Sequence, residues 1–241
     1  MVNGRSLSVR VLSVATIFSA YALSAMPAQA DAPGRGRTAQ FEREYLTFII
    51  NHHFSALRMT ELAAGTDAQR DAAINHPQEG TSPTPNYSST PAKASSDELK
   101  SMARMANRMQ REEINKAQRF LHDWYGVTYT PQLTQEGQQM IQALTQAPAG
   151  NQFDRTFLQT FSNHHYSALL PSLDCQVKSD LNHDELKHYC EGIVNAQTRE
   201  INDMRNQLCK RFNLCDFQPS SGSSATQSSN RYGNAAGRRF G

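Results

Sequence analysis

Cysteine is missing from the chain before Cys175, and long apolar runs are missing after residue 30. No later stretch approaches the roughly 20 apolar residues that a transmembrane helix needs, so we expect no membrane span in the mature chain. A Gly-x-Ser-x-Gly nucleophile elbow is absent too. The late cysteines are even in number, which favours disulfides over a free thiol. Nothing in these patterns indicates a hydrolase.

An excess of basic residues is also lacking. Two of the 24 lysines and arginines, Arg5 and Arg10, lie in the first thirty residues, where no acidic residue occurs. The rest of the chain therefore sets 22 basic against 22 acidic side chains, a net charge of zero with neutral histidine. This balance argues against a nucleic-acid partner.

The first thirty residues have the parts of a secretory signal peptide: two arginines, the apolar run VLSVATIFSAYALSAM, and the small-residue triplet Ala28-Gln29-Ala30. We expect a signal peptide over residues 1–30 and a mature protein that is periplasmic or secreted. At the other end, residues 217–241 are rich in Ser, Gly, Asn and Gln, which predicts a disordered tail. Residues 31–216 are enough for one ordinary domain.

An internal repeat organises this domain. With a shift of 112 residues, FEREYLTFIINHHFSAL, from Phe41, aligns with FDRTFLQTFSNHHYSAL, from Phe153, and nine of 17 positions are identical. With a shift of 87, the segments that begin with DELK at Asp97 and at Asp184 align as well. We therefore expect two copies of a helix pair, at about 38–126 and 151–216, joined by a connector over 127–150.

Apolar side chains recur every three or four residues in both copies, which is the period of an α-helix. Each second segment opens with a capping signal, Ser95-Ser96-Asp97-Glu98 in one copy and Asn182-His183-Asp184-Glu185 in the other, which predicts Ser95 and Asn182, three residues before a glutamate, as the capping side chains. A short helix is expected at about 136–144, and an exposed loop rich in Pro, Ser and Thr from Asn75. The pattern predicts an all-α fold, a four-helix bundle built from two helical hairpins. An irregular all-helical domain is the alternative.

The cysteines are expected to pair within the second copy. The turn between the third and fourth long helices, near 181–183, lies about midway between Cys175 and Cys190, which would then face each other on antiparallel helices. We favour that pairing among the three that four cysteines allow, with Cys209 joined to Cys215 at the end of the last helix. Closing the first loop, of roughly 15 residues, would stabilise the fold by about 3 kcal/mol.

Histidines, glutamates and methionines at inward helix positions are candidates for a metal site. Imidazole and carboxylate are costly to bury unpaired, so they are expected to meet one another, water or a metal ion. Imidazole together with thioether suits copper, especially Cu(I). The structural alternative is that the methionines fill the core and that histidine–glutamate pairs only hold helices together. The candidate ligands are His52, His53, Met59, Glu113, His164, His165, Glu200 and Met204.

The same motifs resemble those of a bacterial ferritin-like family known as domain of unknown function 305, from Phe41 to about Asp216. The family pattern is His-His followed by Ala and Met on one helix, then Gln, Glu-Ile and Met-x-x-Trp-Leu on the next. Members with two such halves include exported copper-binding proteins of cyanobacteria. The resemblance therefore implies a ferritin-like bundle and a role in copper binding or copper resistance.

Each copy departs from the family pattern at one methionine. The matching positions are His52, His53, Ala56, Met59, Gln110, Glu113 and Ile114 in the first copy, and His164, His165, Ala168, Gln197, Glu200, Ile201 and Met204 in the second. Ala117 and Pro171 replace methionines, and Gln207 replaces the tryptophan. One methionine thioether per copy therefore remains, Met59 or Met204. The two copies could share one composite metal site, or each could form a weaker site of its own. Pro171 also predicts a bend in its helix.

We therefore expect an exported protein that binds or sequesters copper, as Cu(I) or Cu(II), without catalysis. Metal ions are the expected partners, while a metal-transfer partner and a homo-oligomer stay open. One alternative is a ferritin-like di-metal oxidase, although Glu185-x-x-His188 is the single Glu-x-x-His and its counterpart is Glu98-x-x-Ser101. The other is a metal-free helical interaction protein.

Overall fold

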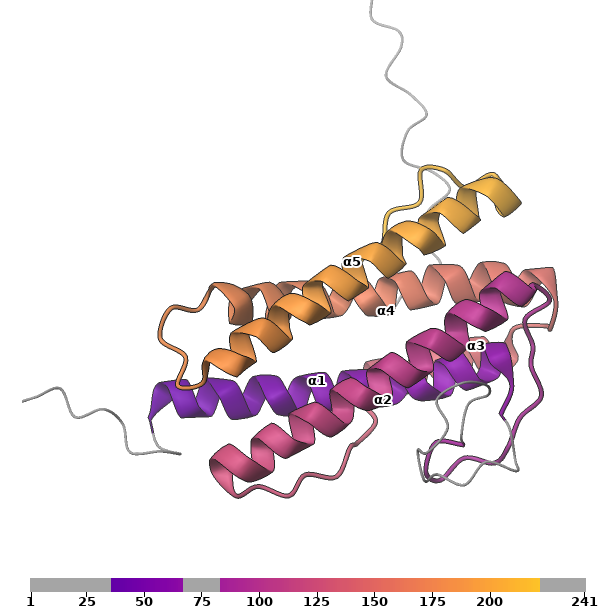
Figure 1. Cartoon of the computed structure of the whole chain (residues 1–241). Helices are drawn as coiled ribbons and strands as arrows, with labels where there is room; N and C mark the ends of the chain where they lie inside the picture. Colours follow the sequence, from indigo (N-terminus) through magenta and orange to yellow (C-terminus); the bar gives the residue numbers. More distant parts are fainter. Residues whose placement is uncertain (1–35, 67–82, 222–241) are drawn as a thin grey trace, which may run out of the picture. The chain divides into compact units, whose positions relative to one another are not determined.

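The computed structural model describes residues 36–66 and 83–221, which contain five α-helices (Figure 1). They are α1 (Arg37–Ala64), α2 (Asp97–Tyr125), α3 (Gln135–Gln146), α4 (Asn151–Val177) and α5 (Asp184–Phe212). The described residues contain no strand, so the predicted all-α class is confirmed. None of the described helices is long and apolar enough to cross a membrane. The predicted signal peptide, and most of the predicted tail, lie outside the described residues.

Helices and loops fall close to their predicted places. The short helix expected at about 136–144 is α3, and α2 begins one residue after its cap, which is Ser96 rather than the predicted Ser95; Ser96 Oγ accepts a hydrogen bond from Leu99 N at 3.3 Å. The described part of the predicted loop, residues 83–96, contains no helix, and only Thr84 and Ala94 in it are buried. Pro171 lies inside α4, which continues to Val177.

The long helices form two hairpins, α1 with α2 and α4 with α5, and α1 also packs against α4 (Figure 1). The helices α1 and α4 run antiparallel. Tyr45, early in α1, bonds Ser172, late in α4, at 3.0 Å, and Thr38, at the start of α1, bonds Asp180, just after α4 ends at Val177. Helix α3 packs against both. The more specific assignment to a ferritin-like bundle stays a prediction.

Both predicted disulfides are present. Cys175 joins α4 to Cys190 of α5, with their Cα atoms 6.0 Å apart, and Cys209 joins the last turn of α5 to Cys215. The first bond lies in the buried cluster at one end of the second hairpin. It therefore fixes how α4 and α5 pair at the end where their connecting turn lies.

A buried carboxylate on α4, Asp154, holds the start of α2. Its oxygens accept hydrogen bonds from the backbone N–H groups of Ser95 at 3.0 Å and Ser96 at 3.3 Å, and from Ser95 Oγ at 2.7 Å. Arg211, in the last turn of α5, donates to the same carboxylate. One side chain thus joins the second helix of the first hairpin to both helices of the second hairpin.

Glu42 of α1 is a second buried carboxylate, and it holds the start of α5. It accepts from the backbone N–H groups of Asn182 at 2.6 Å and His183 at 3.3 Å, and its other oxygen lies 2.7 Å from His183 Nδ1. Tyr125, the last residue of α2, donates its hydroxyl to Glu42. The capping predicted for Asn182 is therefore wrong, because Glu42, distant in sequence, takes the place of a local cap. Glu42 and Asp154 are 112 residues apart, the shift of the repeat.

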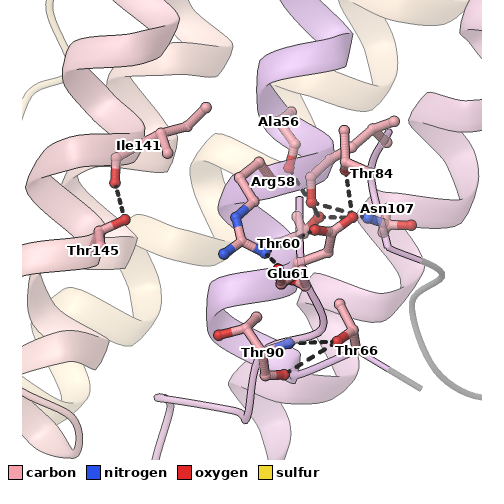
Figure 2. Close-up of polar contacts among 12 residues, drawn as sticks. Ala56, Arg58, Thr60, Glu61, Thr66, Thr84, Thr90, Asn107, Ile141 and Thr145 are labelled. Carbon is pink, nitrogen blue, oxygen red and sulfur yellow. Dashed lines mark hydrogen bonds and ion pairs between the residues drawn. The ribbon is translucent and has the colours of Figure 1, made fainter. Parts of the chain in front are cut away.

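A third buried carboxylate, Glu61, ties the described end of the long loop to α1 (Figure 2). Thr84 Oγ1 donates to Glu61, and Arg58 Nη1 donates to it at 3.1 Å. Burial raises the pKa of Glu61, although the bonds from Thr84 and Arg58 oppose that rise. Beside it, Asn107 Nδ2 of α2 donates to Thr60 Oγ1 at 2.8 Å, so α1, α2 and the loop meet at one polar cluster.

We expect Asp154→Asn to lower the free energy of unfolding by about 2 kcal/mol, because a charged acceptor of several hydrogen bonds becomes a neutral one. Burial opposes ionisation of Asp154, but the bonds from Arg211 and Ser95 outweigh it and hold its pKa below the ordinary value of 3.8. The unfolded chain therefore takes up the proton first as pH falls. The stability difference between wild type and variant should be constant at neutral pH and shrink below about pH 4.

Urea denaturation between pH 7 and pH 3 measures this difference. Asp174→Asn is the matched control, since Asp174 lies on the same helix, is exposed, and loses the same charge. Equal destabilisation by the two variants would show that Asp154 has no special role in joining the hairpins.

Candidate metal centre

The first histidines of the two His-His pairs meet where α1 crosses α4. The rings of His52 and His164 stack with their centroids 3.8 Å apart. His52 Nε2 lies 2.8 Å from the backbone oxygen of His164, and His164 Nε2 lies 3.1 Å from the backbone oxygen of His52. Each imidazole thus bonds the helix that carries the other, and both rings are buried.

Two serines complete this reciprocal arrangement. Ser55 Oγ donates to the backbone oxygen of His52 at 2.7 Å and lies 3.0 Å from His164 Nε2. Ser167 Oγ donates to the backbone oxygen of His164 at 2.8 Å and lies 3.2 Å from His52 Nε2. The sequence prediction did not include these serines, yet both belong to the identical positions of the repeat, which is the signal that could have identified them.

The asparagine that precedes each histidine pair has a structural role. Asn51 Oδ1 accepts from the backbone N–H of Gln132 at 2.8 Å, in the segment that follows α2. Asn163 Oδ1 accepts from the backbone N–H of Ser220 at 3.0 Å, in the segment that follows α5. In the Asn-His-His motif the asparagine therefore holds a returning segment of the chain, while the histidines face the protein interior.

The second histidine of each pair meets a glutamate from the next helix, as the sequence predicts. His53 Nε2 lies 2.9 Å from Glu113 Oε2, and His165 Nε2 makes a closer contact with Glu200 Oε2. The N–H of His53 is not aligned for a hydrogen bond, so its attraction to Glu113 is electrostatic. Both imidazoles are fully buried, whereas the side chains of Glu113 and Glu200 are 21% and 10% exposed.

Burial keeps the central imidazoles neutral. It lowers the pKa of His52 and of His164 well below the ordinary value, and the neighbouring imidazoles lower both further. For Glu200, burial raises the pKa, but the bond from His165 outweighs burial and the pKa is lowered. His52 and His164 are therefore uncharged at neutral pH, and neutral imidazole is the form that binds metal ions.

The surroundings of the rings determine which nitrogen carries the proton. A carbonyl oxygen can only accept, so Nε2 of His52 and Nε2 of His164 must be the donors. In a neutral imidazole this leaves a lone pair on Nδ1. The Nδ1 atom of His164 is buried without a hydrogen-bond partner. An unpaired buried acceptor of this kind is a candidate metal ligand.

The same argument applies to His165, whose Nε2 contacts the Glu200 carboxylate, whereas Nε2 of His53 lies near Glu113 without a hydrogen bond. The Nδ1 atom of His165 is buried and lacks a partner. In the first pair, Nδ1 of His53 lies 3.3 Å from Nδ1 of His52. This contact is a hydrogen bond when one Nδ1 carries a proton, and a metal cation bound by both nitrogens would take the place of that proton.

This spacing suits a shared ion. Two imidazole nitrogens that bind one tetrahedral ion at about 2.0–2.1 Å each lie about 3.3 Å apart. The outer nitrogens also have the partners that metal-binding histidines require, namely the His164 carbonyl for His52 and the Glu113 carboxylate for His53. The pair thus provides two ligands with their orientation already fixed.

The predicted methionines lie elsewhere in the core. Met59 and Met204 are fully buried in one apolar cluster that also contains Phe161 and Ile201. Among the contacts recorded for the described residues, none joins either sulfur to an imidazole. Nor is any group of three or more His, Cys, Asp or Glu side chains in the described residues placed to hold an ion. The structure thus brings six of the eight predicted ligands into one connected row. The other two, Met59 and Met204, lie in the apolar core.

The single Glu-x-x-His of the sequence lies on the surface of α5. Glu185 is exposed, and the side chain of His188 is 78% exposed and lies 3.8 Å from Glu191. This motif therefore does not face the buried histidines, as a ferritin-type site on facing helices would require.

Comparison with protein families gives a match to the family described as Domain of unknown function (DUF305), over residues 88–208. The chain belongs to this family. The matched region runs from the loop before α2 to near the end of α5, so it includes the second His-His pair, Glu113 and Glu200. The presence of two family copies stays a prediction. A search of curated proteins finds no match.

Among solved structures, the fold resembles that of a protein called CopM. Its silver-bound form, obtained by co-crystallization, has a TM-score of 0.51 and 20% identity, and the match covers 71% of this chain and 97% of that one. Its Cu(II)-bound form has a TM-score of 0.50 and 20% identity, with 70% and 96% covered. At this identity the likeness shows the fold alone.

Helix α3 closes one side of the histidine crossing through Gly137. A Cβ atom at this position would lie 2.6 Å from Ser55 Cβ and 3.0 Å from Ser55 Oγ. We expect Gly137→Ala to displace Ser55 from His164 and to lower the free energy of unfolding by about 1–3 kcal/mol. Gly192→Ala, where nothing lies within 4 Å, is the matched control and should raise it by up to about 1 kcal/mol.

Chemical denaturation measures both changes. Imidazole 15N chemical shifts would report whether the hydrogen bond of His164 Nε2 is altered in the Gly137 variant. An unchanged stability and an unchanged His164 spectrum would contradict the packing of α3 on the site.

Proposed function

We propose that this protein binds copper through the Nδ1 atoms of its paired histidines and that its role is to sequester or buffer the metal outside the cytoplasm. The observation that carries the proposal is the 3.3 Å separation of the two Nδ1 atoms of His52 and His53 in a buried site. His52 is neutral and its Nε2 donates to the His164 carbonyl, so the lone pair on its Nδ1 is available to a metal ion.

Ligand chemistry favours copper among the possible ions. Imidazole nitrogen suits zinc, copper, iron and nickel, whereas a thioether selects the soft ion Cu(I). Met59 lies two helical turns from His52 on the same helix, and Met204 lies one turn from Glu200. We infer that one thioether completes the ligand set of each pair. CopM, whose fold is similar, is known in silver-bound and Cu(II)-bound forms, and silver is a common substitute for Cu(I).

We also propose that the two hairpins are two copies of one unit, each with its own pair of imidazoles. Equivalent positions make equivalent bonds: Glu42 and Asp154 each hold the second helix of the other hairpin, and His52 and His164 bond each other's backbone. The first pair is the preferred site, because its nitrogens already face each other. The rings of His164 and His165 are farther apart, 6.0 Å between centroids against 5.5 Å.

Binding without catalysis is the proposed activity. Both disulfides are formed and no cysteine is free, as expected for a protein in an oxidising compartment, which agrees with the signal peptide predicted at residues 1–30. Thioethers and imidazoles are then the soft and borderline ligands that remain for copper.

The first test is the double variant His52→Gln and His53→Gln. The glutamine amide nitrogen takes the place of imidazole Nε2, so the contacts with the His164 carbonyl and with Glu113 can be kept while the Nδ1 ligands are lost. We expect the affinity for Cu(I) to fall by more than about 100-fold, beyond the 10–100-fold effect of losing an outer partner. Competition with a chromophoric Cu(I) chelator measures the affinity, and circular dichroism confirms folding.

The matched control replaces two exposed histidines, His122→Gln and His188→Gln, and should keep the wild-type affinity. If neither the wild type nor the control withdraws copper, while the core variant has lost only thermal stability, the paired histidines hold helices together and the protein is a metal-free interaction module.

A second test separates the two oxidation states. Met59→Leu together with Met204→Leu conserves volume, so the core should lose less than about 1.5 kcal/mol. We expect the affinity for Cu(I) to fall about tenfold and that for Cu(II) to stay within about twofold, because the thioether is a ligand for the softer ion. Chelator competition under reducing and oxidising conditions gives both values. An equal loss for both ions would mean that the methionines act through packing alone.

A further inference from the structure

A surface hollow of about 250 Å³ lies beside the first histidine pair and is lined by residues of α2 and α5. Its lining includes the thioether of Met109, the carboxylates of Glu112 and Glu113, the ammonium of Lys116 and the imidazole of His188. Three kinds of copper ligand thus meet at one place on the surface. None of them except Glu113 has a part in the buried site described above.

Glu113 connects the hollow to the interior. Its side chain is 21% exposed and lines the hollow, while its Oε2 lies 2.9 Å from Nε2 of the fully buried His53. Tyr189 of α5 donates its hydroxyl to the backbone oxygen of Glu113 at 2.9 Å, which fixes α2 beside α5 at this point. One carboxylate therefore stands between solvent and an imidazole that is otherwise closed off.

We infer that this hollow is the loading site through which a copper ion reaches the His52–His53 pair, an inference that rests on the proposed function. Met109, Glu112 and His188 would take up the ion transiently, and Glu113, on binding it, would release Nε2 of His53, so that this ring can turn and offer Nδ1 to the ion. The absence of a preformed group of three His, Cys, Asp or Glu ligands in the described residues agrees with transient contacts, since a closed site would hold the ion at the surface.

Charge in the hollow suits this role. The lining carries two carboxylates, Glu112 and Glu113, and one ammonium, Lys116, so its net charge is negative and attracts a cation. An electrostatic field of this kind raises the association rate without setting the final affinity. Glu112 and Lys116 are exposed, and His188 is largely exposed, so each can rearrange at little cost as an ion arrives. The hollow therefore should determine how fast copper enters and leaves, while the buried pair determines how tightly it is held.

The test is kinetic and uses Cu(I) supplied by a chromophoric chelator to the full-length mature protein. The variant Met109→Leu, Glu112→Gln, His188→Gln removes the three proposed transient ligands and leaves Glu113 and the histidine pairs intact. We expect both the association and the dissociation rate constants to fall by about tenfold, with the equilibrium affinity within about twofold of wild type. Stopped-flow absorbance gives both rates, and excess chelator drives the release.

A matched control makes similar changes at exposed positions outside the hollow: Met105→Leu, Asp203→Asn, His122→Gln. It should keep wild-type rates. Unchanged rates in the hollow variant would overturn the loading route and leave the proposed function standing. A weaker affinity through faster release would overturn it too, because the three residues would then be equilibrium ligands. Failure of the wild type to withdraw copper would overturn the proposed function as well.

Discussion

The crossing of α1 and α4 is the contact on which the rest of the structure depends. There, the imidazole of His52 bonds the backbone of α4 and the imidazole of His164 bonds the backbone of α1. A rotation of either helix about its axis would break both bonds and leave buried polar atoms unpaired, so the two helices hold each other in register. At the two ends of this central pair, Glu42 and Asp154 extend the same reciprocity to α5 and α2.

The interactions that hold the fold also prepare the site. Because the ring Nε2 atoms are used to join helices, the proton is fixed on that side, and the Nδ1 lone pairs are left for another partner. Burial keeps His52 and His164 uncharged and so available as ligands. The structural role of these histidines and the proposed metal-binding role are therefore compatible, since each would use a different nitrogen of the same ring.

Most of the helices, both disulfides and the meeting of histidines with glutamates could be predicted from the sequence, because each follows from helical period, loop composition or the repeat. The cap of α5 could not be predicted. Local signals favour Asn182, whereas the acceptor is Glu42, brought there by the packing of α1. The tautomers of the histidines could not be predicted from the sequence either, since they depend on which carbonyl or carboxylate oxygen each ring contacts. That Met59 and Met204 are metal ligands stays a prediction, because side-chain spacing along one helix does not determine contacts between helices and both side chains lie in the apolar core.

The two hairpins differ most where their connecting loops differ. In the first, the described end of the connecting loop, residues 83–96, lies against α1, where Thr84 bonds Glu61 and Arg58 bonds the backbone oxygen of Ser88. In the second, a short turn leaves the corresponding face of α4 uncovered, and the residues 112 positions later, Leu170 and Leu173, are exposed apolar side chains. The environment of α1 is thus more enclosed and more polar than that of α4. Two histidine pairs with the same sequence therefore lie in unequal surroundings, and their affinities for an ion should differ for that reason, even though their immediate partners are equivalent.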